Sequence, residues 1–318
     1  MKIAFVGASG YGNVGDNTYP LIYSRHLSEH ELLIYNSDLP EEMPADLDLV
    51  VMGGGGILYN NPKGEDPSAP SPHFAKMEHY MKWAIGAGVP YGFSSCGFQF
   101  RPDHEAGFRD SLKPWVPYFE QADFITLRSP KCVSLMRDLV GRDIARWYPD
   151  TGYLMPGLVD ETPAQGSGGL TIVVAGRVSP SDPMSKRFVE FFSSMKYETT
   201  WLSMGARVDD EAQLSFARRR YPGTKVMESL TPHEAYLQIA RSKLVLTGRF
   251  HGMVFARVSG VPFYYPEVVP YKLQAEDLSV PPSHAMGHIT VIREALAKLG
   301  GAKSTGRAMP AACPDPVP

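Results

Sequence analysis

The sequence predicts an α/β protein built from two doubly wound, Rossmann-like domains that face a cleft. Short apolar runs of strand length alternate with amphipathic stretches of helix length along most of the chain. The 318 residues exceed one typical domain, and 43% hydrophobic with 20% charged residues suit a globular fold with a sizeable core. A stretch rich in Pro and Gly interrupts the alternation near the middle, which predicts a linker between two sheets.

Ten apolar runs have the composition of buried parallel strands, five in each half of the chain. They cover residues 3–6, 32–35, 47–52, 91–94 and 124–127, then 170–175, 200–203, 225–227, 244–247 and 262–265. We therefore expect an N-terminal domain over 1–155, a linker over 156–169 and a C-terminal domain over 170–299. Residues 300–318 contain few large apolar side chains, so we expect a disordered tail there.

Charge and cysteine content exclude several classes of protein. The balance of 31 basic against 34 acidic residues gives a net charge of −3, so no nucleic-acid partner is expected. The three cysteines are too few and too far apart for a disulfide framework or a zinc site, and no histidine set has the spacing of metal ligands. No run is long enough to span a membrane. We expect a cytoplasmic protein with no metal, and attachment to a membrane surface is left open.

The loop after the first predicted strand is rich in glycine. In open parallel sheets, ligands bind beyond the carboxyl ends of the strands, so this loop is a candidate site. Gly10, Gly12 and Gly15 formally match a dinucleotide fingerprint, but they begin too far from the strand, and Asp16 would face a pyrophosphate. A tight turn whose glycines adopt positive φ is the alternative. Polar residues at the expected helix start can cap that helix or contact a ligand: Asn13, Asp16 and Asn17.

A run of four glycines follows the third predicted strand. Ordering residues 53–56 costs backbone entropy, which favours a loop that approaches a phosphate or a sugar over a merely flexible turn. A second loop of small and polar residues follows the fourth strand. The candidate contacts in these two loops are Gly54, Gly55, Gly56, Asn60 and Ser95.

Two arginines and a histidine are the candidate anion site. Arg128 follows the fifth strand, and strand 244–247 leads into the segment Gly248-Arg249-Phe250-His251-Gly252. In an extended chain Arg249 and His251 would project to one side and Phe250 to the other. A histidine beside Arg and Gly at a strand-to-helix junction suits catalysis better than an isolated one. Arg128 facing Arg249 would clamp a small dianion, with Arg177 as a third cation, although a lone Arg more often pairs with a carboxylate.

Five segments taken together resemble the polysaccharide pyruvyl transferase family over most of residues 1–275. They are residues 12–17, 48–56, 122–128, 149–150 and 247–252, and residues 260–262 with Tyr271 and Lys272 resemble the closing segment of the family. The resemblance implies a GT-B-like fold, phosphoenolpyruvate as co-substrate without another cofactor, and a sugar or glycan acceptor that becomes a pyruvate ketal. It also implies a donor site at Arg128, Arg249 and His251, flanked by Gly248 and Gly252, with Lys272 among the acceptor contacts.

This chain departs from the family pattern at two places. Ser129 stands where an acidic residue is common, and Asn17 replaces a frequent second aspartate after Asp16. The mechanistic hypothesis is that His251 protonates the methylene of the donor, that Asp16 acts as base toward the acceptor hydroxyl, and that phosphate leaves. A GT-B glycosyltransferase that uses a nucleotide sugar and a non-catalytic ligand-binding homologue are the alternatives. Lipid-linked, nucleotide-linked and free acceptors all fit this pattern, and the oligomeric state is left open.

Overall fold

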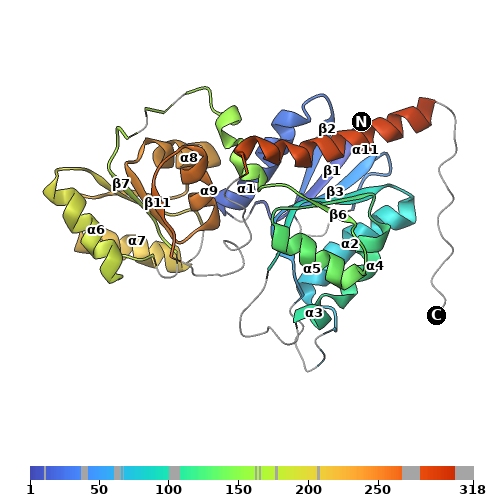
Figure 1. Ribbon diagram of the computed structural model, residues 1–318, viewed down its shortest axis with the longest axis horizontal. Helices are drawn as coiled ribbons and strands as arrows, with labels where there is room; N and C mark the ends of the chain where they lie inside the picture. The colour runs from blue at the N-terminus through green and yellow to red at the C-terminus, as the bar shows by residue number, and fades with distance from the viewer. Residues whose placement is uncertain are drawn as a thin grey trace.

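The computed structural model folds the chain into two parallel β-sheets, each covered by helices on both faces (Figure 1). The described residues are 1–10, 12–36, 42–60, 66, 68–99, 108–161, 163–164, 166–175, 178–205, 208–266 and 280–304. One sheet has the strand order β2-β1-β3-β4-β5-β6 and the other β11-β10-β7-β8-β9. All neighbouring pairs among these described strands are parallel, which confirms the predicted α/β fold.

The first sheet buries apolar side chains on both of its faces. In β1, Val6 faces one core while Phe5 faces the other, as the two-residue period of a strand requires. The strands are β1 (Lys2–Gly7), β2 (Glu31–Asn36), β3 (Leu49–Leu58), β4 (Tyr91–Phe98), β5 (Phe124–Leu127) and β6 (Ala145–Trp147). Their carboxyl ends point toward the second sheet in Figure 1.

β3 and β4 are longer than the sequence predicted. The glycine run 53–56, expected to form a loop, lies inside β3, where Gly55 pairs with Cys96 of β4. The polar residues after Ser94, also expected in a loop, continue β4 to Phe98. Backbone hydrogen bonds hold these residues in the sheet without apolar side chains, so a pattern of apolar runs ends each strand too early. The three-residue β6 was missed, because it is too short to show a period.

Helices α2, α4 and α5 cover one face of the first sheet, and α1 covers the other. Ser71 and Ser129 cap α2 and α5 by accepting hydrogen bonds from backbone N–H groups, and a proline follows each cap. These signals fix where the two helices begin. The elements are α1 (Val14–His26), α2 (Pro72–Ala87), α3 (Phe108–Ser111), η2 (Lys113–Trp115), α4 (Val116–Gln121), α5 (Pro130–Val140) and η3 (Thr151–Leu158).

The second sheet repeats this arrangement, with α6 and α7 on one face and α8 and α9 on the other. β9 and β10 have the bounds that their apolar runs predicted. The strands are β7 (Leu170–Val173), β8 (Thr199–Leu202), β9 (Lys225–Met227), β10 (Leu244–Thr247) and β11 (Phe263–Tyr264). The helices are α6 (Pro183–Ser194), α7 (Val208–Arg220), α8 (Pro232–Arg241) and α9 (Phe250–Val258).

The last helix returns to the first sheet. After η4 (Pro282–Ala285), α11 (Met286–Ser304) lies along the first sheet, where Ile289 and Ile292 share a core with β1 and α1 (Figure 1). The sequence had assigned residues up to 299 to the second domain and a disordered tail to residues 300–318. Instead α11 packs against the first sheet and continues through residues 300–304, while residues 305–318 lie outside the described part. No described helix is both long and apolar enough to cross a membrane.

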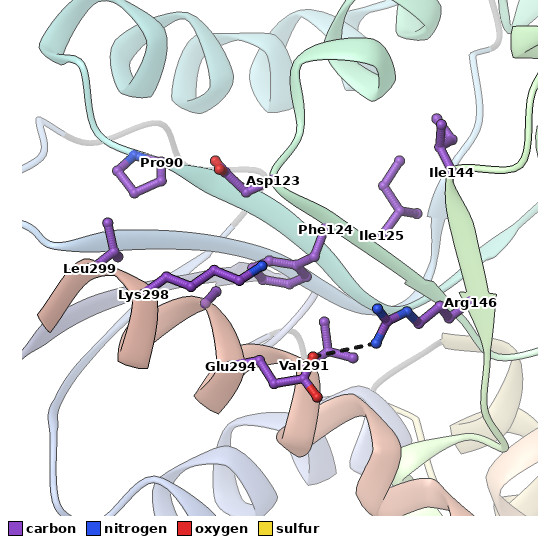
Figure 2. A pocket seen from close by; sticks show the side chains of 11 residues that line it. Pro90, Asp123, Phe124, Ile125, Ile144, Arg146, Val291, Glu294, Lys298 and Leu299 are labelled. Atoms are coloured by element: carbon purple, nitrogen blue, oxygen red, sulfur yellow. Dashed lines mark hydrogen bonds and ion pairs between the residues drawn. The ribbon is translucent and has the colours of Figure 1, made fainter. Parts of the chain in front are cut away.

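A cavity of about 200 Å³ separates α11 from the amino ends of β4 and β5. Arg146 of β6 pairs with Glu294 of α11 across it at 3.4 Å (Figure 2). Its other lining residues are Pro90, Asp123, Phe124, Ile125, Ile144, Val291, Ala295, Lys298 and Leu299. Because ligands of doubly wound sheets bind at the carboxyl ends of the strands, this cavity lies at the edge opposite the expected active site.

Candidate active site

Asp150 is the centre of a buried cluster at the carboxyl edge of the first sheet. Its carboxylate is fully buried, and Oδ2 accepts hydrogen bonds from the hydroxyl of Tyr19 at 2.7 Å and from Nη1 of Arg128 at 3.1 Å. The second oxygen, Oδ1, accepts from the backbone N–H of Gly152 at 2.8 Å and lies 3.4 Å from Nε2 of His251. Four segments of the chain therefore meet at one carboxylate.

Local structure explains how these side chains converge. Arg128 follows β5 directly and its backbone N–H donates to Cys96 of β4, which places the guanidinium at the sheet edge. A Cβ on Gly97 would stand 2.6 Å from Nε of Arg128, so this glycine lets the arginine lie against β4. Asp150 follows β6 and caps η3. The sheet edge thus fixes the backbone of both charged residues.

The charges of the cluster reinforce one another. Burial by itself would raise the pKa of Asp150, but the nearby His251 and Arg128 and the hydrogen bonds to the carboxylate hold it well below its usual range. Burial and the Asp150 charge raise the pKa of Tyr19, so this phenol stays protonated and can donate. At neutral pH the cluster therefore holds a carboxylate, a guanidinium, a phenol and an imidazole in direct contact.

His251 reaches this cluster from the second sheet. It is the second residue of α9, it is buried, and its ring packs edge-on against Tyr19 with 5.5 Å between centroids. A Cβ on Gly15 would overlap Nδ1 of the imidazole, so only glycine at this position lets His251 approach the first turn of α1. Gly15 thus makes room for a side chain, whereas Gly10 and Gly12 supply the positive φ of a tight turn.

Arg249 and His251 do not project to one side, contrary to the sequence prediction. The helix begins at Phe250, so the alternation of an extended chain does not apply. The Phe250 ring, expected to point away, lies 4.8 Å from the Arg128 guanidinium. Arg249 instead pairs through Nη2 with Asp210 at 2.5 Å, inside the second half. Each arginine of the predicted clamp therefore already has a carboxylate partner.

The amino end of α9 has unfilled capacity to bind an anion. Its N-cap residue, Arg249, forms no side-chain hydrogen bond that caps the helix. Nε of Arg249 is buried without a hydrogen-bond partner among the described residues. A helix amino end with unbonded N–H donors favours a phosphate or a carboxylate, because the backbone donors and the helix dipole act together.

Asn13, Asp16 and Asn17 shape the loop that faces α9. Asn13 caps α1 by accepting from Gly15 N–H at 3.0 Å, and its amide donates to Asp16 at 2.6 Å. Asn17 accepts from Gly10 N–H at 2.9 Å and so holds the turn. Asp16 stands beside Gly15 on the first turn of α1, next to the residue that His251 contacts.

Most of the chain matches the model of one known protein family. The family model described as polysaccharide pyruvyl transferase matches residues 10–265, which contain every member of the buried cluster. The chain belongs to the polysaccharide pyruvyl transferase family. Membership in this family makes the protein a transferase at the level of its class. A search of curated proteins finds no match.

Solved structures show that this family member shares its fold with UDP-sugar enzymes. UDP-GlcNAc 2-epimerase from Methanocaldococcus jannaschii matches with a TM-score of 0.54 and 9% identity over 91% of this chain and 92% of that one. A putative UDP-N-acetylglucosamine 2-epimerase from Listeria monocytogenes has 0.54 and 13% over 98% and 92%. S. aureus MnaA with UDP has 0.54 and 11% over 83% and 79%. At such identities the likeness shows the GT-B type of fold alone.

The glycines that the pyruvyl transferase resemblance highlighted mostly make room for protein atoms. A Cβ on Gly54 would overlap Tyr19, one on Gly56 would stand 2.8 Å from Gln99, and one on Gly55 would stand 3.1 Å from Asp16. Gly248 and Gly252 allow the tight turn between β10 and α9, because a Cβ would overlap Ala175 or Thr247. The glycine run therefore lets α1 approach β3 and brings Tyr19 to Asp150.

Two predicted acceptor contacts of this transferase are occupied by the protein itself. Both ends of the Asn60 amide bond to the backbone, to Ala69 at 2.8 Å and from Ser71 at 2.7 Å. Ser95 is fully buried and accepts from Thr151 N–H at 3.2 Å. The strand or loop that carries each side chain turns it inward, so each bonds to the protein backbone. Arg177 and Lys272 lie outside the described residues.

Sequence reasoning missed Tyr19, Asp150 and Asp210 as residues of the candidate site. Asp150 had a signal, since it follows the last strand of the first sheet within the matching segment 149–150. Tyr19 lies one turn after Asp16 on α1, and a tyrosine within a helix has no local pattern that marks it as a site residue. Among the described residues, no group of three or more His, Cys, Asp or Glu side chains could hold a metal ion.

Proposed function

We propose that the protein transfers the pyruvyl group of phosphoenolpyruvate onto sugar hydroxyls, forming a pyruvate ketal and releasing phosphate. The observation that carries this proposal is the His251–Asp150 pair, formed by residues from both halves of the chain beside Arg128. Family membership supports transfer of a pyruvyl group, and the uncapped end of α9 supports an anionic donor. The acceptor is a sugar or a glycan.

Donor binding in this proposal relies on groups that keep spare hydrogen-bonding capacity. Arg128 is neutralised by Asp150, and Arg249 shares Nη2 with Asp210. The unbonded Nε of Arg249 and the first N–H groups of α9 stand at the same helix end. A phosphate or carboxylate bound there meets a guanidinium and a helix dipole together, which is the arrangement that charge-assisted recognition of a small anion requires.

His251 is the proposed general acid. Asp150 stays ionised and lies beside Nε2, so it orients the ring, while Nδ1 is turned toward the first turn of α1. The imidazole gives its proton to the donor methylene, which becomes a methyl group, and the adjacent carbon takes up positive charge.

Asp16 is the proposed base on the acceptor side. It takes the proton of the attacking hydroxyl, whose oxygen bonds to the positively charged carbon. The bond from this carbon to the phosphate oxygen then breaks, phosphate leaves with its electron pair, and a second hydroxyl closes the ketal with loss of its proton. Asp16 suits this role because it lies on the turn that faces His251.

Phosphate release from phosphoenolpyruvate, measured with free, nucleotide-linked and lipid-linked sugars, tests this function. We expect release with one acceptor class, and a loss of about a hundredfold or more in His251→Ala. His284→Ala is the matched control, since this histidine is exposed in η4. Full release by His251→Ala would refute its role. Thermal stabilisation by a nucleotide sugar and not by phosphoenolpyruvate would favour a glycosyltransferase, and binding without turnover would favour a non-catalytic homologue.

A further inference from the structure

His288 is a fully buried histidine on α11 that joins three segments of the first sheet. Its Nδ1 lies 2.6 Å from the hydroxyl of Thr126 in β5 and accepts from the backbone N–H of Ser95 in β4 at 3.2 Å. Its Nε2 lies 3.0 Å from the carbonyl oxygen of Pro149. Thr126 lies two residues before Arg128, and Pro149 lies directly before Asp150. Ser95 lies in β4 where that strand shifts register.

The backbone partners fix the form of the imidazole. Ser95 N–H can only donate and the Pro149 carbonyl can only accept, so Nδ1 must be the acceptor and Nε2 must carry the hydrogen. His288 is therefore neutral, and both of its nitrogens are satisfied. A neutral imidazole with two fixed partners holds two backbone segments at a set distance from each other.

Ser95 is the strained point of this arrangement. Its φ of 54° lies in the left-handed region, which is unfavourable for a residue with a side chain, and β4 shifts register between Phe93 and Cys96. The Ser95 hydroxyl accepts from the backbone N–H of Thr151 at 3.2 Å. At this kink the N–H of Ser95 donates to His288, and the hydroxyl of Ser95 accepts from Thr151.

Asp150 stands between the two points that this network anchors. His288 holds the carbonyl before it, at Pro149, and Ser95 holds the N–H after it, at Thr151. We infer that His288 is a positioning residue that keeps the Asp150 carboxylate against His251 and Arg128. This inference rests on the proposed function, because it assigns His288 to the same reaction.

Packing of α11 does not by itself require a histidine here. Ile289, Ile292 and Leu296 already bury the apolar face of the helix against β1 and α1. A buried imidazole costs free energy of desolvation that an apolar side chain at this position would not. The two backbone hydrogen bonds of His288 offset this cost, and the groups that form them set the position of Asp150.

Variants of His288 that keep one nitrogen each test this role. His288→Gln keeps a donor near the position of Nε2 and His288→Asn keeps an acceptor near Nδ1, while His288→Ala keeps neither. We expect His288→Ala to lower kcat for phosphate release by about tenfold or more with less than about a threefold change in KM for phosphoenolpyruvate. The kcat should fall more than the KM rises because Asp150 holds His251 and not the donor. His288→Gln should recover most of the kcat, and His288→Asn should not.

The control is Ile289→Val, which weakens the packing of α11 beside His288 without touching Pro149 or Ser95. It should lower the melting temperature and leave kcat unchanged. Equal losses of kcat in the Ala, Gln and Ile289→Val variants, in step with the melting temperature, would assign His288 a structural role only and overturn the inference.

Amide hydrogen exchange gives a readout that does not depend on turnover. Gly152 N–H donates to Asp150, so its exchange reports directly on the position of that carboxylate. We expect faster exchange at Gly152 in His288→Ala and protection close to wild type in His288→Gln. If the wild-type protein releases no phosphate but this exchange pattern appears, the proposed reaction fails while the positioning of Asp150 stands. If exchange at Gly152 is the same in His288→Ala as in wild type, the positioning itself is refuted.

Discussion

Nε2 of His251 lies 3.4 Å from Oδ1 of Asp150, so a helix that covers the second sheet contacts the edge of the first sheet through this pair of side chains. Parallel sheets place ligands at the carboxyl ends of their strands, and this pair stands where two such edges meet. The pair therefore joins the two halves of the fold at the place where a ligand would bind.

Replacing Asp150 by Asn should damage both activity and stability. The substitution leaves the buried Arg128 guanidinium without its counter-charge, which costs about 3–5 kcal/mol in a buried pair. It also weakens the contact that orients the His251 ring, so phosphate release should fall about a hundredfold or more. Urea unfolding and the phosphate assay measure the two effects. Asp143→Asn is the matched control, because Asp143 is exposed and pairs only loosely with Arg137. Unchanged stability in Asp150→Asn would show that Arg128 does not depend on this carboxylate.

Gly15→Ala should abolish most activity while the protein stays folded. Alanine suits the first turn of α1 because Gly15 is helical and lacks a positive φ, but its Cβ would overlap Nδ1 of His251. His251 must then move away from Asp150. We expect kcat to fall about a hundredfold. Gly86→Ala in α2 is the control, since nothing lies within 4 Å of a Cβ there, and it should keep full activity. Normal turnover by Gly15→Ala would mean that His251 has room to adjust.

The sequence predicted the strands better than the site. β5, β9 and β10 have the predicted bounds because each is a short apolar run between turn residues. The glycine run of β3 has no apolar side chain, so the local pattern could not show that it pairs within the sheet. Local patterns report which side chains are buried, and a strand of glycines is held by its backbone alone.

The candidate site depended on contacts that no local pattern contains. The predicted Arg249 and His251 alternation failed because α9 begins one residue after Arg249, and helix boundaries are the least certain part of a sequence-based assignment. Tyr19 and Asp150 are 131 residues apart, and His288 and Thr126 are 162 apart. Only the return of α11 to the first sheet brings the last pair together.

Arg249→Lys should weaken donor binding more than it lowers turnover. Lysine keeps the charge but loses the planar fork, so its single ammonium cannot stand at both the Nη2 position that bonds Asp210 and the Nε position left for a donor oxygen. We expect KM for phosphoenolpyruvate to rise about tenfold, with kcat reduced less. Steady-state kinetics separate the two parameters. Arg241→Lys is the control, since that arginine forms an exposed pair with Glu161. An unchanged KM would remove Arg249 from the donor site.

His288 should make the protein less stable in mild acid. Burial lowers its pKa from the ordinary 6.5 to about 4, and Tyr148 and Asp150 are the titratable groups nearest to it. Between these two pH values the unfolded chain binds a proton that the native protein excludes, so this contribution to stability is complete above pH 6.5 and is lost as the pH falls toward 4. Across that window the loss is about 3 kcal/mol. Asp150 has a lowered pKa, so its own loss begins below its ordinary value of 3.8, outside this window.

Urea unfolding of wild type and His288→Gln at pH 7 and pH 4.5 measures this contribution of His288 to the free energy of unfolding. Glutamine does not titrate, so the stability difference between the two proteins should shift in favour of the variant as the pH falls. His284→Gln is the control, because this exposed histidine in η4 should show no such pH-dependent difference from wild type. A difference between wild type and His288→Gln that stays constant from pH 7 to pH 4.5 would show that the imidazole accepts its proton in the folded protein, and that Ser95 N–H and the Pro149 carbonyl do not hold it neutral.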